Sequence, residues 1–246
     1  MNFFAIGDLH LSGNPPTHPM DVFGPHWDKH WERIRSYWQD HVKADDVVFI
    51  LGDTSWALHL DEALPDLKAI AQLPGKKYII RGNHDYWWSS LRKMNIATEE
   101  QFTFLQGRGA MAIDGHRAVA FGGSRAYLCP NDSAFKEETD LSIYKRELLR
   151  VEAALQEMDQ LLKQARQENP SIREEVRILL LHYPPFNDEN EASGFTELME
   201  KYKVDHCLFG HLHDENSFKR IPANFGATQL HLASADYLHF TLKELL

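Results

Sequence analysis

Short apolar runs recur along the chain and alternate with longer amphipathic stretches. The runs are rich in Val, Ile, Leu and Phe, which favour β-strands. They predict eight strands, at residues 3–6, 47–51, 78–81, 118–122, 178–181, 206–209, 229–233 and 239–242. Apolar side chains three or four positions apart predict helices at residues 27–42, 61–72, 141–167 and 194–202. This alternation of strands and helices indicates an α/β fold.

The helix predicted at residues 141–167 is the longest element of the chain. Its apolar residues follow a rhythm of four and three, which could serve a coiled-coil partner. A long amphipathic helix lying on the domain is the simpler interpretation. Residues 12–25 and 126–139 are irregular and predict loops, although the second stretch could also form a lid. We expect one domain over residues 1–246, with a helical insertion around residues 140–168.

Polar motifs with metal-binding side chains follow five of the apolar runs. The motifs are Asp8-Leu9-His10, Gly52-Asp53, Gly82-Asn83-His84-Asp85, His182 and Gly210-His211-Leu212-His213. Each motif alone has an ordinary explanation, such as a turn or a helix cap. If the chain stays extended after the first strand, Asp8 and His10 point the same way and can share a cation. Together, the motifs supply enough oxygen and imidazole ligands for two metal ions at the strand ends, where α/β folds gather ligands.

This ordered set of motifs resembles that of the calcineurin-like metallophosphoesterase superfamily, and the resemblance extends from Asp8 to His213. It implies a four-layer sandwich of two mixed β-sheets flanked by helices, with the metal centre at the C-terminal ends of the strands. Protein Ser/Thr phosphatases of this superfamily carry an Asp-Arg pair shortly after the bridging Asp. Here Thr54-Ser55-Trp56 follows Asp53, so the chain is closer to compact bacterial phosphoesterases.

The resemblance also implies a role for each residue of the motifs. One metal would be held by Asp8, His10, Asp53 and His213, and the second by Asp53 as a bridge with Asn83, His182 and His211. His84 would be the catalytic histidine. Asp85 could orient His84 in catalysis, or it could cap the next helix. The nitrogen and oxygen donors without a thiolate fit Mn²⁺ first, then iron or Zn²⁺.

Two further residues are candidates for binding the substrate. Arg125 follows the strand predicted at residues 118–122 and could hold a phosphate bidentately, or it could be structural. Tyr86, directly after the Asn-His-Asp motif, could stack on a ring of the substrate, or it could pack in the core. Two divalent ions beside Asp8 and Asp53 leave the site cationic, which suits an anionic phosphoryl group.

Composition and charge limit the partners and the compartment. The formal net charge of −10 disfavours binding to long nucleic acids, because a phosphate backbone would be repelled. Cys129 and Cys207 lie outside any C-x-x-C pair and are expected to be free thiols. The N-terminus has no leader pattern, and no apolar run reaches the length of a membrane span. We therefore expect a cytoplasmic protein without membrane contact.

The expected activity is that of a dinuclear phosphoesterase that uses a metal-activated hydroxide. Its substrate would be a phosphate mono- or diester of a small molecule. One alternative is a nuclease or cyclic-nucleotide phosphodiesterase. Another is a non-catalytic metal-binding scaffold acting through partners, which the presence of His84 disfavours. The motifs leave open the physiological substrate and the oligomeric state.

Overall fold

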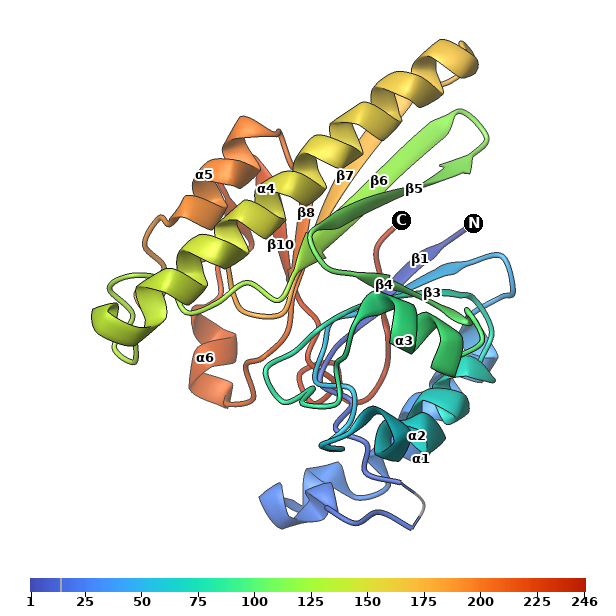
Figure 1. Ribbon diagram of the computed structural model, residues 1–246, viewed down its shortest axis with the longest axis vertical. Coiled ribbons are helices and arrows are strands. Elements are labelled where there is room, and N and C mark those ends of the chain that lie inside the picture. The colour runs from blue at the N-terminus through green and yellow to red at the C-terminus, as the bar shows by residue number, and fades with distance from the viewer. Residues whose placement is uncertain (14) are drawn as a thin grey trace. The chain divides into compact units, whose positions relative to one another are not determined.

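The computed structural model describes residues 1–13 and 15–246. It contains two β-sheets with helices packed against them (Figure 1). The α/β class and the presence of two mixed sheets, both expected from the sequence, are confirmed. The chain divides into two units. The first consists of Met1–Phe104, Gly210–His213 and Ala233–Leu246, and the second of Leu105–Phe209 and Asp214–Leu232. Residue 14, within the loop predicted at residues 12–25, lies outside the described residues.

The first unit contains a five-stranded sheet in the order β11-β1-β2-β3-β4. Its strands are β1 (Phe3–Ile6), β2 (Val47–Ile50), β3 (Lys76–Ile80), β4 (Phe102–Leu105) and β11 (Lys243–Glu244). Strands β1, β2 and β3 are parallel, and β11 runs antiparallel to β1. The register pairs Ile6 with Ile50 and Ile50 with Ile79. The polar motifs that follow these three strands therefore begin at the same edge of the sheet.

Helices and short 3₁₀ turns complete the first unit. They are η1 (Met20–Phe23), η2 (Pro25–Trp27), α1 (His30–His41), α2 (Leu60–Ala71) and α3 (Leu91–Ala97). Ile34 and Trp38 on α1 and Leu67 and Ile70 on α2 belong to one buried apolar cluster with the strands of this unit. The indole N–H of Trp38 donates to the carbonyl oxygen of Pro74 at 2.9 Å, so its polar atom is satisfied inside the core.

The second unit contains a six-stranded sheet in the order β5-β6-β7-β8-β10-β9. Its strands are β5 (Arg108–Asp114), β6 (Arg117–Ser124), β7 (Glu174–Leu181), β8 (His206–Phe209), β9 (Asn224–Phe225) and β10 (Thr228–Leu232). Strands β6, β7, β8 and β10 are parallel, and the two outer pairings are antiparallel. Its helices are α4 (Glu137–Glu168), α5 (Gly194–Lys201) and α6 (Glu215–Arg220).

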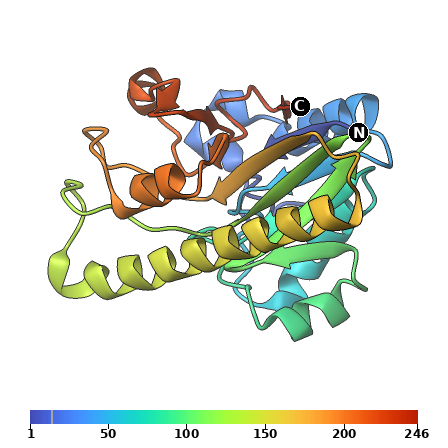
Figure 2. The same ribbon diagram turned by 90° about the horizontal axis from the view of Figure 1, so that it is seen from above.

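The long helix α4 packs along β5 and β6 within the second unit. Figure 2 shows α4, coloured from green to yellow, extending beside the strands of this sheet. Val151, Leu155, Met158 and Leu162 form part of its buried face. This arrangement agrees with the simpler interpretation of the sequence, an amphipathic helix that lies on its own domain. Among the helices of the described residues, none has the length and apolar character of a membrane span.

Several predicted elements differ from the structure. The strand predicted at residues 239–242 is wrong, because His239 and Phe240 have φ angles of 51° and 62° and form a turn before β11. Helix α1 begins at His30 rather than at residue 27, because Lys29 has a left-handed φ of 52°. The two predicted loops are partly helical. The loop at residues 12–25 contains η1 and the first residue of η2, and α4 begins at Glu137, inside the loop predicted at residues 126–139. The sequence did not predict α3, α6, β4, β5, β9 or β11.

Candidate metal centre

Left-handed backbone conformations occur at four of the predicted metal ligands, all in the first unit. Asp8, His10, Asp53 and His211 have φ angles of 59°, 46°, 50° and 73°. The chain is therefore not extended from Asp8 to His10, contrary to the expectation from sequence. Such conformations cost about 1–3 kcal/mol each for residues other than glycine and persist where the surroundings hold them. Here the amide of Asp8 donates to the carbonyl of Gly52, and that of His10 to the carbonyl of Asp53, both at 2.9 Å.

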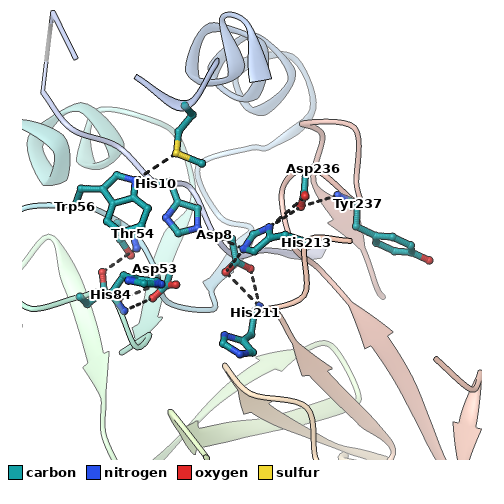
Figure 3. Close-up of polar contacts among 12 residues, drawn as sticks. Asp8, His10, Asp53, Thr54, Trp56, His84, His211, His213, Asp236 and Tyr237 are labelled. Atoms are coloured by element: carbon teal, nitrogen blue, oxygen red, sulfur yellow. Dashed lines mark hydrogen bonds and ion pairs between the residues drawn. The ribbon is translucent and has the colours of Figure 1, made fainter. Parts of the chain in front are cut away.

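Three of the predicted ligands form a cluster in the first unit (Figure 3). Nε2 of His213 lies 3.4 Å from Nε2 of His10 and 3.4 Å from Oδ1 of Asp8. Ligand atoms bound about 2.0–2.1 Å from a tetrahedral metal ion are themselves about 3.4 Å apart. The chain's own donors therefore fit a transition-metal ion at this position.

Asp236 is a residue of this cluster that the sequence analysis missed. Nδ1 of His213 lies 3.1 Å from Oδ1 and 3.2 Å from Oδ2 of Asp236. The amide of Tyr237 donates to Oδ1 of Asp236 at 3.0 Å, which fixes the carboxylate. A carboxylate on the far nitrogen of a ligating histidine sets its tautomer and orientation. In the sequence, Asp236 could have been noticed as an acidic residue shortly after the strand that ends at Leu232. It belongs to none of the motifs, however.

Two carboxylates also control the protonation of His213. Burial lowers the pKa of His213, but its hydrogen bonds and charge interactions with Asp236 and Asp8 outweigh this effect and raise it to about 10. The side chain is 35% exposed, so solvent can reach it. Without a metal ion, His213 is therefore an imidazolium between two carboxylates. A metal ion that binds Nε2 must displace its proton, so its affinity falls as the pH is lowered.

Glycines allow the strand ends to approach one another. A Cβ atom on Gly52 would lie 2.5 Å from the amide nitrogen of Gly82, and one on Gly82 would lie 2.1 Å from Oδ1 of Asp53. Likewise, a Cβ atom on Gly210 would lie 2.3 Å from Oδ2 of Asp8. Separations this short do not occur between such atoms, so only glycine fits. This requirement explains why glycine precedes three of the motifs.

Asp85 is fully buried and binds the backbone around Asp53. Its Oδ2 accepts hydrogen bonds from the amides of Asp53 at 2.9 Å and Gly82 at 2.7 Å. Its Oδ1 accepts from the amide of Thr54 at 2.8 Å and from the indole of Trp87 at 2.9 Å. These contacts support a positioning role for Asp85, and the catalytic role considered from the sequence stays a prediction.

A cavity of about 470 Å³ lies at the cluster within the first unit. Five residues of the predicted site and five others line it: His10, Asp53, His84, His211 and His213, with Met20, Phe23, His26, Trp27 and Trp56. The ring of His84 lies 4.6 Å from that of Trp56, and the amide of His84 donates to Oδ1 of Asp53 at 2.8 Å. His84 thus faces the same cavity as the candidate ligands.

The remaining predicted residues have different positions. Asn83 follows β3 in the first unit and is half-buried. Tyr86 is 55% exposed, and its ring lies 6.2 Å from that of His84. His182 and Arg125 belong to the second unit, where the amide of the buried His182 donates to the carbonyl of Arg125 at 3.2 Å. The guanidinium of Arg125 lies over the ring of Tyr127. The roles predicted for His182 and Arg125 stay predictions.

The sequence is similar to one protein family and to a phage protein. Residues 1–215 match the family model of the calcineurin-like phosphoesterases. Over 84 residues, the chain is 34% identical to the gene 66 protein of Mycobacterium phage D29. This match covers 34% of the chain and 40% of the phage protein, so it spans less than half of that relative's length.

Solved structures show a likeness of fold at low sequence identity. The chain has a TM-score of 0.53 and 14% identity to a phosphopantetheinyl hydrolase from Mycobacterium tuberculosis, over 100% of this chain and 95% of that one. The protein TT1561 of Thermus thermophilus gives a TM-score of 0.51 and 12% identity, over 99% and 97%. A protein of unknown function from Aquifex aeolicus gives a TM-score of 0.50 and 13% identity, over 99% and 95%.

Replacing Asp85 by Asn is expected to disturb Asp53 and weaken metal binding. An amide group can replace only one acceptor oxygen, so its NH₂ would face backbone N–H donors. We expect a loss of about 2–4 kcal/mol in the free energy of unfolding, measured by denaturant titration, with a lower metal content by elemental analysis. The control is Asp61→Asn, an exposed position in the first turn of α2. Full metal content with lost turnover would instead assign Asp85 to catalysis.

Replacing Asp236 by Ala is expected to loosen His213 without removing a ligand. Loss of such a carboxylate partner typically lowers metal affinity by about 10–100-fold. Competition with a chromogenic chelator measures this change directly. Asp45→Ala, in the exposed turn before β2, is not part of the cluster and serves as the control. Unchanged affinity in Asp236→Ala would remove Asp236 from the metal centre.

Proposed function

The chain belongs to the calcineurin-like phosphoesterase family, a family of metal-dependent hydrolases of phosphoester bonds, and we propose that it uses two metal ions to hydrolyse phosphate mono- or diesters of a small molecule. One observation carries the proposal. Ligand atoms of Asp8, His10 and His213 lie within 4.8 Å of one another. His84, a candidate proton donor, lines the cavity at this cluster.

The proposed ligands follow the residue types and their order in the chain. Asp8, His10, Asp53 and His213 would hold the first ion. Asp53 would bridge to a second ion held with Asn83, His182 and His211. The left-handed conformations of Asp8, His10, Asp53 and His211 support this assignment, because backbone strain gathers at functional sites. The absence of thiolates from this proposed set favours Mn²⁺, followed by iron and Zn²⁺.

The chain's own residues bind the phosphoryl group and move a proton. When bound, a pair of metal ions supplies positive charge for the phosphoryl oxygens and lowers the pKa of water toward neutrality. Hydrolysis forms a bond from the attacking oxygen to phosphorus and breaks the bond to the leaving oxygen. As an imidazolium, His84 would donate a proton to that leaving oxygen and become a neutral imidazole, and the proton released from the attacking water would restore it. Its backbone hydrogen bond to Asp53 and the adjacent ring of Trp56 hold His84 in position.

The alternatives differ from this proposal in substrate or in turnover. A nuclease or cyclic-nucleotide phosphodiesterase would share the metal ligands, while a scaffold would bind metal without turnover. The net charge of −10 favours small substrates over long nucleic acids. A panel of aryl phosphate, bis-aryl phosphate, nucleotides and cyclic nucleotides separates these possibilities. The cytoplasmic location stays a prediction from the sequence.

The purified protein is expected to bind about two transition-metal ions per chain. Chelation should abolish hydrolysis of an aryl phosphate, and Mn²⁺ should restore it, because the metal supplies the charge at the phosphoryl group. Elemental analysis and activity before and after chelation measure both effects. Hydrolysis that persists in fully chelated protein would contradict the proposed function.

Replacing His84 by Ala is expected to lower turnover about 10²-fold or more while metal content stays unchanged, because a proton donor is lost and the proposed ligands remain. His41→Ala, at the exposed end of α1, is the matched control and should retain full turnover. The measurements are kcat for an aryl phosphate and metal content of the same samples. Full turnover in His84→Ala would exclude the proposed proton transfer.

A further inference from the structure

The cavity at the metal centre has an apolar wall that the proposed chemistry does not use. We call this feature the aromatic wall, and it consists of Met20, Phe23, Trp27 and Trp56. The first three residues come from η1 and η2, and Trp56 lies in the loop between β2 and α2. Met20 and Trp27 are buried, whereas Phe23 is 64% exposed at the rim. Ligand pockets are lined mostly by apolar and aromatic side chains, and this wall has that character.

Direct contacts join the aromatic wall to the candidate ligands. The ring of Trp56 stacks on that of His10, with the ring centroids 4.8 Å apart and the planes 23° apart. The indole N–H of Trp56 donates to the sulfur of Met20 at 3.3 Å (Figure 3). The ring of Trp27 lies 6.0 Å from that of His213 and 5.0 Å from that of Phe240. A group leaving the phosphorus would therefore meet this wall within the same cavity.

The buried carboxylate of Asp66 binds residues in both segments that contribute to the aromatic wall. Oδ1 of Asp66 on α2 accepts a hydrogen bond from the amide of Gly13 at 2.8 Å. Its Oδ2 accepts from the hydroxyl of Ser55 at 2.6 Å. Gly13 lies near the start of the segment that leads to η1, and Ser55 lies between Asp53 and Trp56. Asp66 thus connects two segments. One is the segment before η1, and the other is the loop that carries both Asp53 and Trp56.

The charges in the cavity select against a second anionic group. Of the ten residues described as lining it, none is a Lys or Arg. Outside the predicted metal and catalytic residues, His26 is the one lining residue with a nitrogen-containing ring other than an indole. The positive charge of the proposed metal ions suits one phosphoryl group. A carboxylate or second phosphate in the rest of the substrate would face aromatic carbon in a chain of net charge −10.

We propose that the aromatic wall binds the leaving group, and that the substrates are phosphoesters whose alcohol or phenol part is uncharged and carries an apolar ring or branched chain. This inference rests on the proposed function. The cavity of about 470 Å³ has the size of a site for a small molecule. Aromatic side chains recognise a ring by offset or edge-to-face contact, without a specific charge.

Binding of non-hydrolysable phosphonates separates the wall from the metal centre. Titration calorimetry on the metal-loaded protein compares methylphosphonate, benzylphosphonate and 4-carboxybenzylphosphonate. These probes share the phosphoryl arm and differ in the part that would meet the wall. We expect benzylphosphonate to bind about tenfold more tightly than methylphosphonate, and the added carboxylate to remove most of this gain.

Two substitutions at the exposed rim test the position of the leaving group. Phe23→Ala should lower affinity for benzylphosphonate about fivefold, raise KM for benzyl phosphate by a similar factor, and leave methylphosphonate binding unchanged. Phe23→Arg should shift the preference toward 4-carboxybenzylphosphonate by about tenfold, because it adds the missing positive charge. The matched control is Val22→Ala, which is 73% exposed on the same turn and does not line the cavity.

The outcomes distinguish this inference from the proposed function. The inference would be overturned if the protein bound all three probes with equal affinity and if neither Phe23 variant changed binding. The proposed function would still stand in that case, provided that the protein hydrolyses phosphoesters. Metal-loaded protein that hydrolyses no ester of the panel would overturn the proposed function, and the inference with it. The expected shifts in both Phe23 variants, with an unchanged Val22→Ala, would establish the aromatic wall as the site of the leaving group.

Discussion

The buried carboxylate of Asp85 holds together the loops on which the candidate centre depends. An ionised carboxylate is costly to bury unless several donors satisfy it. Three backbone amides and one indole donate to Asp85 within 2.9 Å, and the amides come from the loops after β2 and β3. One side chain thus sets the distance between two neighbouring strand ends. It also holds Asp53 in a left-handed conformation that an isolated loop would leave. The orientation of the Asp53 carboxylate, and through it the backbone of His84, follows from this arrangement.

Segments far apart in the sequence complete the cluster of candidate metal ligands at these loops. The amide of His211 donates to the carboxylate of Asp8, although 203 positions separate them. Asp236 then holds the ring of His213 from its far side. Backbone hydrogen bonds join the loops after β1 and β2 to each other. In the metal-free protein, the positive charge of His213 offsets part of the negative charge of the two carboxylates around it. A metal ion can take over this role, which links metal binding to the stability of the closure.

The sequence predicted the strand ends well because each motif directly follows a buried apolar run. Parallel strands in register bring the ends of β1, β2 and β3 to one edge. That Asp8, His10 and His213 would share a metal ion was implied by the resemblance of the motifs to those of the calcineurin-like family, and the three side chains do meet. The role of Asp236 could not be predicted in this way, since it depends on a contact with His213 that no spacing encodes. Asp85 is adjacent to His84 in the sequence, yet its side chain binds backbone amides. The apolar residues at 239–242 predicted a strand, but Phe240 belongs to a turn and Leu242 directly precedes β11, and both are buried there.

The cavity is lined on one part by candidate metal ligands and on another by apolar side chains, and these two sets come from different parts of the fold. Hard oxygen and nitrogen donors come from strand ends, where sheet register and glycine contacts leave little freedom. The apolar side chains of Met20, Phe23 and Trp27 come from a segment outside the sheet, which Asp66 connects to the rest of the site. Changes in that segment can alter the shape of the wall without moving a strand. In the proposed function, binding of the phosphoryl group would depend on the strand ends of the sheet, whereas selection of the leaving group would depend mainly on a segment outside the sheet.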